Sequence, residues 1–587
     1  MIRRNLLAAT AMCAAFATGA IAQTDLKPVT TEVLQNPDPA DWLMINRTHD
    51  EQRYSPLNQI NKDNAKNLTL AWSRGLSVGT QESTPLVYQG VMFAYDPGAG
   101  ILALDAKTGD FLWEYRREYS REVAEFVGSP QSARSKSLAI WQDMLYYDAP
   151  DGFIVAIGIK DGKLRWQTQV TAPATKSQHT GGVMIADGKV ISNRSCETWA
   201  GCFIAAHDAA TGKELWKFYT APRTGEPGGD TWGNMPDDQR IASSWGLPGS
   251  YDPATKTVFW AIANQKPYTR LKRHGNPDGV SRIAPAELYS NSTVALDVET
   301  GKLKWYYQHL PGDDWDADHI HERTIVRAPF DPDPKSAKWI NPNVKRGEQR
   351  DMVIAVGEGG GIFALDKNNG QFLWGSPFPY DIPQYNVSNI DPVSGKVEIN
   401  WNNVMKKEGD VVITCFHNTR SYWSTAYHPG LNSLYVPFHD QCLSMEARQA
   451  NPLGFGKRFG ILRPGADINK YAGIAKINLS TGKMDVIHTQ AAPGNGSALT
   501  TGGGLLFWGD VNRRFRAFDA ENGKILWEAI VGGVVMTSTI TYAVDGRQYV
   551  AIFTGAGQSG TAGVLSIARS VRAIRNHNAI YVFALPK

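Results

Sequence analysis

Apolar and polar residues alternate along most of the chain, in short runs that end at glycine-containing turns. In one recurring unit, an apolar run ends at an Asp or similar turn former, a Gly precedes a Trp by four residues, and a second apolar run follows. Alternation with period two is typical of β-strands, and Gly reaches positive φ without steric penalty. Each unit therefore predicts a β-hairpin. Six copies contain the Trp: Ala103–Trp113, Ala156–Trp166, Ala206–Trp216, Ala295–Trp305, Ala364–Trp374 and Ala517–Trp527.

Two further segments extend this series. Lys476–Val486 keeps the Thr481-Gly482 turn but has Val in place of Trp. Trp72 lacks a local hairpin partner, and we expect the C-terminal strand Ile580–Leu585 to supply it and close a ring.

The repeat predicts an all-β fold, an eight-bladed β-propeller. One four-stranded sheet cannot bury both of its faces, so radially stacked sheets cover one another, and a Trp on each outer hairpin fills the wedge between neighbours. Unrelated hairpins in a sandwich are the alternative, but they would not keep the Gly-to-Trp spacing constant. The uneven intervals between the Trp residues predict long insertions between blades, where functional residues concentrate.

The repeat spans nearly all of the 587 residues, so we expect one domain over residues 23–587. Residues 1–22 have the charged start, the apolar segment Leu6–Phe16 and the small residues Gly19–Ala22 of a secretory signal, with cleavage before Gln23. We therefore expect the mature protein in the periplasm.

Charge and hydropathy argue against two kinds of partner. Loss of Arg3 and Arg4 with the signal lowers the formal charge from +3 to +1, which favours neither nucleic acid nor an anionic membrane. No later apolar run is long enough to span a bilayer. The chain also lacks a Cys-x-x-Cys-His motif, so we expect no attached haem and no fused cytochrome.

Four cysteines remain once Cys13 leaves with the signal, and an even count in an exported protein favours disulfides. We predict the pairs Cys196–Cys202 and Cys415–Cys442, because each is close in sequence, although four cysteines allow three pairings. Cys13 as a lipidation site is the alternative, but Thr10–Cys13 is a poor match to such a motif.

The densest group of polar residues is Gly312–His319, which has four carboxylates within six residues. These carboxylates repel one another unless a cation or a proton lies among them. The segment therefore indicates either a site for a hard cation or a solvated acidic turn.

Three residues elsewhere favour the cation site. Glu197 lies between Cys196 and Cys202, where a disulfide would hold its loop in place. Asn264 ends an apolar strand, and it is either a ligand for a calcium-like ion or an ordinary turn residue. Trp245 lies outside the hairpin repeat, and it is either part of the core or a platform on which a flat ligand stacks.

Together these motifs resemble the quinoprotein alcohol dehydrogenases, exported eight-bladed propellers that hold pyrroloquinoline quinone (PQQ) on their axis beside a metal ion. The resemblance covers nearly the whole mature chain, from Arg53–Ile60 to Asp545–Val550. It implies that Asp316 is the catalytic base, that Trp245 lies under the quinone, and that Cys415–Cys442 is a structural disulfide. It also implies metal ligands at Glu197, Asn264 and Asp316, and cofactor contacts at Glu51, Lys136 and Thr180.

Three positions depart from the family pattern. Gly128–Arg134 lacks the adjacent cysteine pair that many members hold over the cofactor. Glu358, in Gly357–Gly361, stands where the family usually has a cation near the reactive carbonyl. Asp318 stands two residues after Asp316, where its presence resembles the lanthanide-using members, whose trivalent ion accepts another carboxylate. Sugar-oxidising relatives also have an acid there, so calcium and a lanthanide are both expected candidates.

The resemblance implies oxidation of a primary or secondary alcohol to an aldehyde or ketone, with Asp316 as base and metal-assisted hydride transfer to PQQ. A separate soluble cytochrome c would accept the electrons. The substrate classes of the family are small alcohols, polyols, sugars, polymers and bulky polycyclic secondary alcohols; the missing cysteine pair and the loop 196–202 favour larger polyols or sugars. Two alternatives are a non-catalytic propeller scaffold of the cell envelope and a metal-dependent hydrolase.

Overall fold

The computed structural model describes residues 26–587 except Ala99, Glu122, 124–133, 173–174, 176–179, 197–200, 556–560, Ala573 and Arg575. The predicted signal (residues 1–22) and Glu197 lie outside the described residues. Strands dominate, and every described helix is too short or too polar to cross a membrane. The α-helices are α1 (Thr31–Gln35), α3 (Arg270–His274) and α4 (Thr561–Ile567), and the 3-10 turns are Ala65–Asn67, Gly229–Trp232, Asp237–Gln239, Trp401–Asn403, Pro429–Leu431 and Ile468–Lys470.

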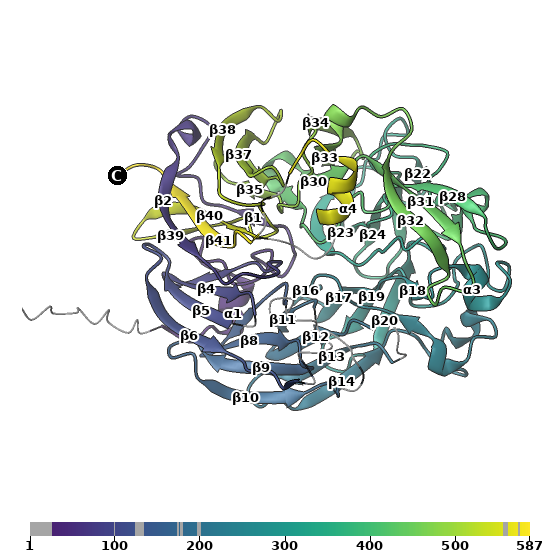
Figure 1. Cartoon of the computed structure of the whole chain (residues 1–587), viewed down its shortest axis with the longest axis horizontal. Coiled ribbons are helices and arrows are strands. Elements are labelled where there is room, and N and C mark those ends of the chain that lie inside the picture. The colour runs from purple at the N-terminus through teal and green to yellow at the C-terminus, as the bar shows by residue number, and fades with distance from the viewer. Residues whose placement is uncertain are drawn as a thin grey trace, which may run out of the picture.

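Sheets of four or five strands follow one another around a centre in chain order, which confirms the all-β propeller (Figure 1). The first sheet of this series contains β3 (Leu86–Tyr88), β4 (Val91–Asp96), β5 (Gly100–Asp105) and β6 (Phe111–Arg116), and the second contains β7 (Ala139–Trp141), β8 (Met144–Ala149), β9 (Phe153–Gly158) and β10 (Leu164–Gln169). The third contains β11 (Val183–Ala186), β12 (Lys189–Asn193), β13 (Phe203–Asp208) and β14 (Glu214–Tyr219). The fourth contains β16 (Ser250–Asp252), β17 (Thr257–Ala261), β19 (Ser292–Asp297) and β20 (Leu303–Gln308).

The remaining sheets of the series lie in the second half of the chain. The fifth sheet contains β21 (Thr324–Pro329), β23 (Gln349–Val356), β24 (Ile362–Asp366), β25 (Phe372–Ser376) and β22 (Trp339–Ile340), and the sixth contains β29 (Ala426–His428), β30 (Ser433–His439), β33 (Ala472–Asn478) and β34 (Met484–Gln490). The seventh contains β1 (Tyr54–Ser55), β35 (Leu499–Thr501), β36 (Leu505–Gly509), β37 (Arg514–Asp519) and β38 (Ile525–Ile530). The last contains β2 (Thr69–Gly75), β41 (Ala579–Ala584), β40 (Arg547–Thr554) and β39 (Ile540–Val544).

Five of the Trp residues pack against the turn glycine of the next sheet. A Cβ atom at Gly301 would lie 2.5 Å from Cε3 of Trp216, and the Trp216 indole donates a 2.8 Å hydrogen bond to the carbonyl of Val298. The recurring glycine therefore meets two demands, a positive φ in its own turn and the ring of a neighbouring Trp. The same contact joins Gly109 with Trp72, Gly162 with Trp113, Gly212 with Trp166, and Gly370 with Trp305.

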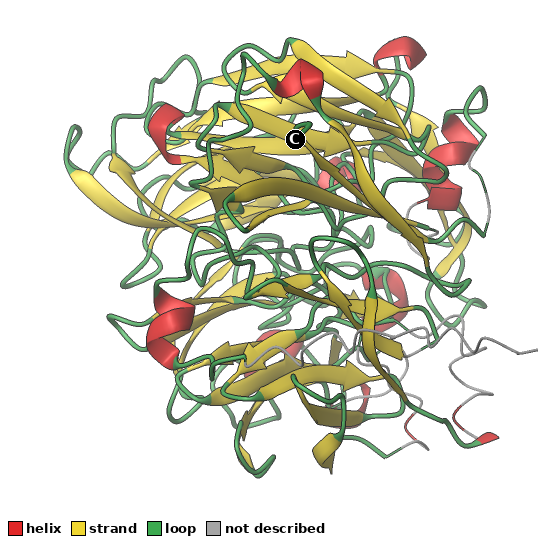
Figure 2. Ribbon diagram, turned by 90° about the vertical axis from the view of Figure 1, so that its left-hand side faces the viewer, coloured by secondary structure: helices red, strands yellow, loops and turns green. Residues whose placement is uncertain are grey.

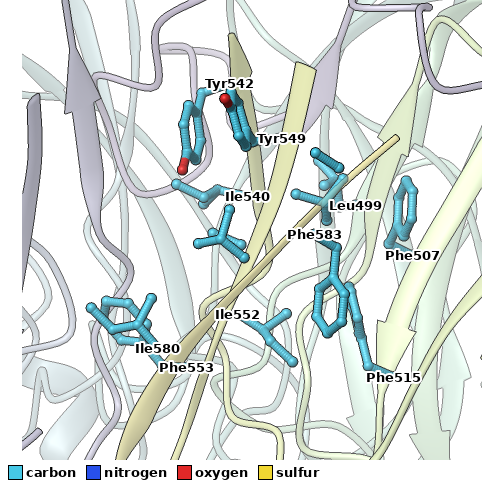
Figure 3. Packing of buried hydrophobic residues seen from close by; sticks show 14 of the residues in the cluster. Leu499, Phe507, Phe515, Ile540, Tyr542, Tyr549, Ile552, Phe553, Ile580 and Phe583 are labelled. Atoms are coloured by element: carbon cyan, nitrogen blue, oxygen red, sulfur yellow. The ribbon is translucent and has the colours of Figure 1, made fainter. Parts of the chain in front are cut away.

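The two ends of the chain share one sheet, as predicted for Trp72. Strand β2 pairs antiparallel with β41, and Trp72 lies opposite Val582. Figure 3 shows the apolar cluster between this sheet and the neighbouring strands β35–β38, in which Phe515 packs near Phe583 with ring centroids 5.8 Å apart. Burial of each large apolar side chain contributes about 2 kcal/mol, so this contact anchors the terminal strands.

Long insertions form small sheets of their own. They are β15 (Ile241–Ala242) with β18 (Gln265–Lys266), β26 (Val387–Ile390) with β27 (Val397–Ile399), and β28 (Val411–Cys415) with β31 (Gln441–Ala447) and β32 (Phe455–Leu462). The strands β15 and β26–β28 lie between large sheets, as predicted, whereas β18 interrupts the sheet of β17 and β19, and β31 and β32 interrupt that of β30 and β33. The few short helices stand between the strand layers and at their margins (Figure 2). Both predicted disulfides are present, Cys196–Cys202 and Cys415–Cys442, and the second joins directly opposed residues of β28 and β31.

Candidate metal and cofactor site

The acidic segment 312–318 is a folded loop in which Asp313 and Asp314 each accept two hydrogen bonds from backbone N–H groups. Asp313 accepts hydrogen bonds from the N–H groups of Trp315 (2.7 Å) and Ala317 (2.8 Å). Asp314 accepts from the N–H groups of Arg270 (2.6 Å) and Met405 (2.8 Å). Asp313 and Asp314 therefore shape the loop, whereas Asp316 and Asp318 face the residues Asn264 and Trp245.

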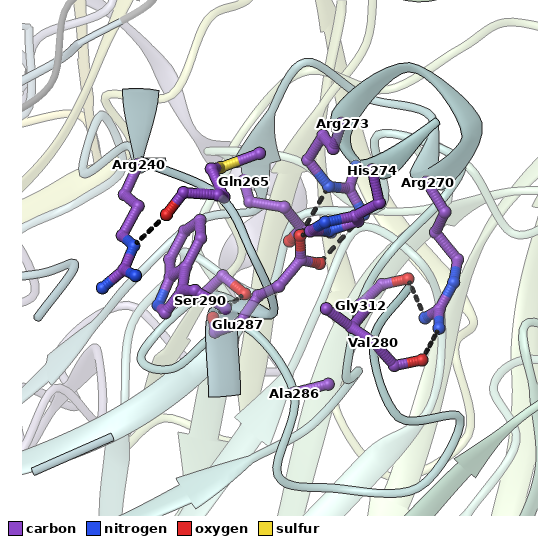
Figure 4. A network of polar contacts seen from close by, with 12 residues as sticks. Arg240, Gln265, Arg270, Arg273, His274, Val280, Ala286, Glu287, Ser290 and Gly312 are labelled. Atoms are coloured by element: carbon purple, nitrogen blue, oxygen red, sulfur yellow. Dashed lines mark hydrogen bonds and ion pairs between the residues drawn. The ribbon is translucent and has the colours of Figure 1, made fainter. Parts of the chain in front are cut away.

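Helix α3 and its surroundings hold this loop from one side (Figure 4). Arg270 Nη1 donates to the carbonyl of Gly312 (2.9 Å), and Arg273 Nη2 donates to the carbonyl of Asp313 (2.8 Å). Buried Glu287 accepts from Arg273 at 2.7 and 2.9 Å and contacts His274 at 2.7 Å. Each charged group has a partner, so the network fixes the loop without leaving a buried charge unpaired.

Asn264, three residues beyond β17, joins Asp316 to Asp318. Its Nδ2 donates to Asp316 Oδ1 (2.7 Å), and its backbone N–H donates to Asp318 Oδ1 (2.7 Å). The Trp245 indole donates to Asp318 Oδ2 (2.6 Å). The structure thus brings together Asn264, Asp316, Asp318 and Trp245, which the sequence analysis selected from three separate segments.

Glu358 adds a third buried carboxylate beside this group. Its N–H donates to the carbonyl of Asp318 (2.7 Å), and its Oε1 accepts from Ser421 Oγ (2.5 Å). A Cβ atom at Gly359 would lie only 2.8 Å from Cβ of Ala317, which explains the glycine-rich segment. The close approach of the two loops places an acid where the family usually has a cation.

Two cations that the sequence analysis did not select face Asp316. Lys266 Nζ, in β18, lies 3.7 Å from Asp316 Oδ1. Arg458 lies on β32, 142 residues after Asp316 in the sequence, and its Nη2 donates to Asp316 Oδ2. Neither cation belongs to a recognisable motif, so no local signal in the sequence could have identified it.

The carboxylates differ in their proton affinity because the cations lie on one side. Burial and then the Asp316 charge raise the pKa of Asp318 to about 7. Burial, followed by Asp318, raises the pKa of Glu358 well above its ordinary value. Burial also opposes ionisation of Asp316, but Arg458 and Lys266 outweigh it and lower the pKa of this group. Asp316 is therefore the carboxylate of the three that is most fully ionised, and so able to accept a proton, at neutral pH.

A second group of residues borders Trp245 on its other side. Lys136 Nζ donates to the carbonyls of Thr180 (3.0 Å) and Trp245 (3.3 Å), and it lies 5.3 Å from the Trp245 ring centroid. Glu82 Oε2 lies 3.5 Å from Lys136 Nζ, and Tyr422 has its ring centroid 5.5 Å from the same nitrogen. The structure thus unites Lys136 and Thr180 with Trp245 and adds Glu82 and Tyr422.

Glu51 lies in a different network. Its carboxylate accepts from Asn46 Nδ2, and its charged neighbours are Asp50, Arg53 and Glu322. The described hydrogen bonds and ion pairs do not link Glu51 to Lys136 or Trp245. Glu82, which the sequence analysis did not select, is the carboxylate beside Lys136.

The oxygen atoms of this site fit a hard cation. Asn264 Oδ1 is buried and has no hydrogen-bond partner, and it lies beside Asp316 and Asp318. Oxygen donors of this kind suit calcium and similar ions. Within the described residues no three His, Cys, Asp or Glu side chains form a metal-binding group, and the expected fourth donor, Glu197, lies outside them.

Comparison with known proteins gives the class of the fold and site. The family model for PQQ, described as glucose/ethanol/alcohol dehydrogenase, beta-propeller domain, matches residues 42–441 and 470–550. The chain therefore belongs to the quinoprotein alcohol dehydrogenase family.

Relatives within the family align along most of the chain. The dehydrogenase subunit of the alcohol dehydrogenase (quinone) of Gluconobacter oxydans is 29% identical, over 96% of this chain and 77% of the relative. The crystallised quinohemoprotein alcohol dehydrogenase ADHIIG of Pseudomonas putida has a TM-score of 0.80 at 26% identity, over 95% of this chain and 82% of that chain. A europium-containing methanol dehydrogenase has the same fold, with a TM-score of 0.80 at 23% identity, over 94% and 99% of the two chains.

Proposed function

We propose that this protein is a periplasmic PQQ-dependent dehydrogenase that oxidises primary or secondary alcohols to aldehydes or ketones. The observation that carries the proposal is the convergence of Asn264, Asp316 and Asp318 beside Trp245. Membership of the quinoprotein family and relatives named alcohol dehydrogenases support the same conclusion. A non-catalytic scaffold would need neither this convergence nor an unpartnered amide oxygen, so the enzyme is the better interpretation.

The proposed site divides into a metal side and a cofactor side. Asn264 Oδ1, Asp316 and Asp318, with Glu197, would hold calcium or a lanthanide ion. Trp245, Lys136 and Thr180, with Glu82, would hold the quinone. The proposed fold behind this site is a ring of eight blades, one for each four- or five-stranded sheet.

The bound quinone and metal would supply the hydride acceptor of the reaction. Asp316 accepts the proton of the substrate hydroxyl, because its lowered pKa keeps this carboxylate ionised at neutral pH. Arg458 and Asn264 each donate to one oxygen of Asp316, which fixes the direction of its lone pairs. A soluble cytochrome c is the proposed electron acceptor.

Reconstitution tests this proposal. Purified protein is titrated with PQQ in the presence of Ca²⁺ or La³⁺, and absorption and turnover of an alcohol panel are recorded with a dye acceptor and with cytochrome c. The panel contains small alcohols, polyols, sugars, polymeric alcohols and bulky secondary alcohols. We expect bound quinone and turnover of at least one class.

An Asp316→Asn variant should bind the quinone and lose turnover by about a thousandfold or more, as expected on loss of a general base. Asp381→Asn is the matched control, because Asp381 is an exposed carboxylate that is also paired with a lysine, Lys338 (2.7 Å). Normal turnover by Asp316→Asn would exclude Asp316 as the base. Failure of the wild-type protein to bind PQQ with either ion would refute the proposed function.

A further inference from the structure

The small sheet of β28, β31 and β32 contributes Arg458 to the candidate site. Arg458 lies on β32 opposite Met445 of β31. Strand β31 is joined to β28 by the Cys415–Cys442 disulfide, and Cys442 also pairs with Ile461 on β32. The crosslink therefore holds the sheet that positions Arg458.

Several contacts determine where the guanidinium group lies. Its Nη2 contacts both Asp316 Oδ2 and His417 Nε2, the latter at 2.7 Å. The centre of the guanidinium lies 5.3 Å from the Phe455 ring and 5.6 Å from the Tyr268 ring, distances typical of cation–π contacts. An Arg fixed in this way loses little conformational freedom when it binds a further ligand.

Arg458 still has hydrogen-bonding capacity for such a ligand. Its Nε is buried and has no partner, while the side chain as a whole is 24% exposed. A buried donor without an acceptor is costly unless a ligand completes it. Lys266 is less suited, because its ammonium already donates to Tyr268 Oη (2.6 Å) and its side chain is only 4% exposed.

We propose that Arg458 is the cationic contact of the redox cofactor in this protein, supplied from β32 in place of the segment where Glu358 stands. This inference rests on the proposed function. The guanidinium bridges Asp316 on one side and an electronegative oxygen of the quinone on the other. The site thus keeps a cation beside the catalytic carboxylate although Gly357–Gly361 contributes an acid.

Cofactor binding measures this role independently of turnover. Wild type, Arg458→Met, Arg458→Lys and Arg463→Met are titrated with PQQ at saturating Ca²⁺, and the dissociation constant and the absorption maximum of the bound quinone are recorded. Arg463→Met is the matched control, because Arg463 lies just beyond β32 and pairs with Asp440 at 2.7 and 2.9 Å. Circular dichroism verifies the fold of each variant.

We expect Arg458→Met to bind PQQ about tenfold more weakly, as for loss of a charged hydrogen bond, and to shift its absorption maximum. Arg458→Lys should recover part of both changes, and Arg463→Met should match wild type. Wild-type affinity and spectrum in Arg458→Met would overturn the inference, as would equal losses in the Arg458 and Arg463 variants. If wild type binds no PQQ, the proposed function fails too, whereas normal binding by Arg458→Met refutes this inference alone.

Discussion

The packing of Trp216 on the turn glycine of the next sheet predicts a specific instability for Gly301→Ala. Gly301 has φ +67°, and its Cβ would lie 2.5 Å from Cε3 and 2.6 Å from Cδ2 of Trp216. The left-handed conformation alone costs an alanine about 1 kcal/mol, and overpacking adds about 1–3 kcal/mol. We therefore expect Gly301→Ala to lower the free energy of unfolding by about 2–4 kcal/mol.

Gly546→Ala separates the two contributions. Gly546 also lies in a hairpin turn with positive φ, +72°, but no heavy atom lies within 4 Å of its Cβ position. Gly546→Ala should therefore lower the free energy of unfolding by the conformational contribution alone, about 1 kcal/mol. The measurement is urea-induced unfolding followed by far-UV circular dichroism, with wild type and both variants compared under identical conditions.

A double variant isolates the contact itself. In a Trp216→Ala background the ring is absent, so Gly301→Ala should cost no more than Gly546→Ala. Equal destabilisation by Gly301→Ala and Gly546→Ala in the wild-type background would refute the reasoning. Such a result would mean that Gly301 is needed only for the positive φ of its own turn and that Trp216 moves aside without a loss of stability.

Three further predictions concern the ionic network, the disulfide and the metal. Burial opposes ionisation of Glu287, but Arg273 and His274 together outweigh it and lower the pKa to about 2 from 4.5, so this network stabilises the fold above pH 4.5 and the stabilisation is lost as the pH falls toward 2. Glu287→Gln should cost about 3 kcal/mol at pH 7 and remove that pH dependence, as measured by urea unfolding between pH 2 and 7; an unchanged profile would contradict this. Replacing Cys415 and Cys442 by Ala should cost about 3 kcal/mol, as for closure of a 27-residue loop, and weaken PQQ binding; normal binding would separate the crosslink from the site. Glu358→Gln should lower the affinity ratio of La³⁺ to Ca²⁺ in competition titrations, and an unaltered ratio would exclude a role of this carboxylate in metal preference.

The sequence predicts the strand arrangement well where a pattern repeats. The hairpins, the long insertions and the pairing of the Trp72 strand with the C-terminal strand all follow from residue spacing and are confirmed. The second role of the turn glycine was not predictable, because its contact with the Trp of the preceding hairpin arises only when sheets stack.

The site was predictable to the extent that its residues belong to motifs. Asn264, Asp316 and Trp245 each lie in a distinctive segment, and they do converge. Arg458 and Glu82 have no local pattern, and the fold alone brings them to the site. The number of acids in Gly312–His319 overstated the number of candidate metal ligands, because Asp313 and Asp314 accept hydrogen bonds from backbone N–H groups.

The charges of the site connect its departures from the family pattern. Glu358 adds an acid whose pKa is raised by burial and by Asp318, and the ion pairs of Arg458 and Lys266 are with Asp316. Lys266 also lowers the pKa of Asp318, but burial and the Asp316 charge outweigh it and raise that pKa to about 7. A carboxylate in this position is ionised only if a cation of sufficient charge lies beside it. A trivalent ion would compensate two ionised carboxylates better than a divalent one, so competition of La³⁺ with Ca²⁺ for wild type and for Glu358→Gln measures how far these acids set the metal preference.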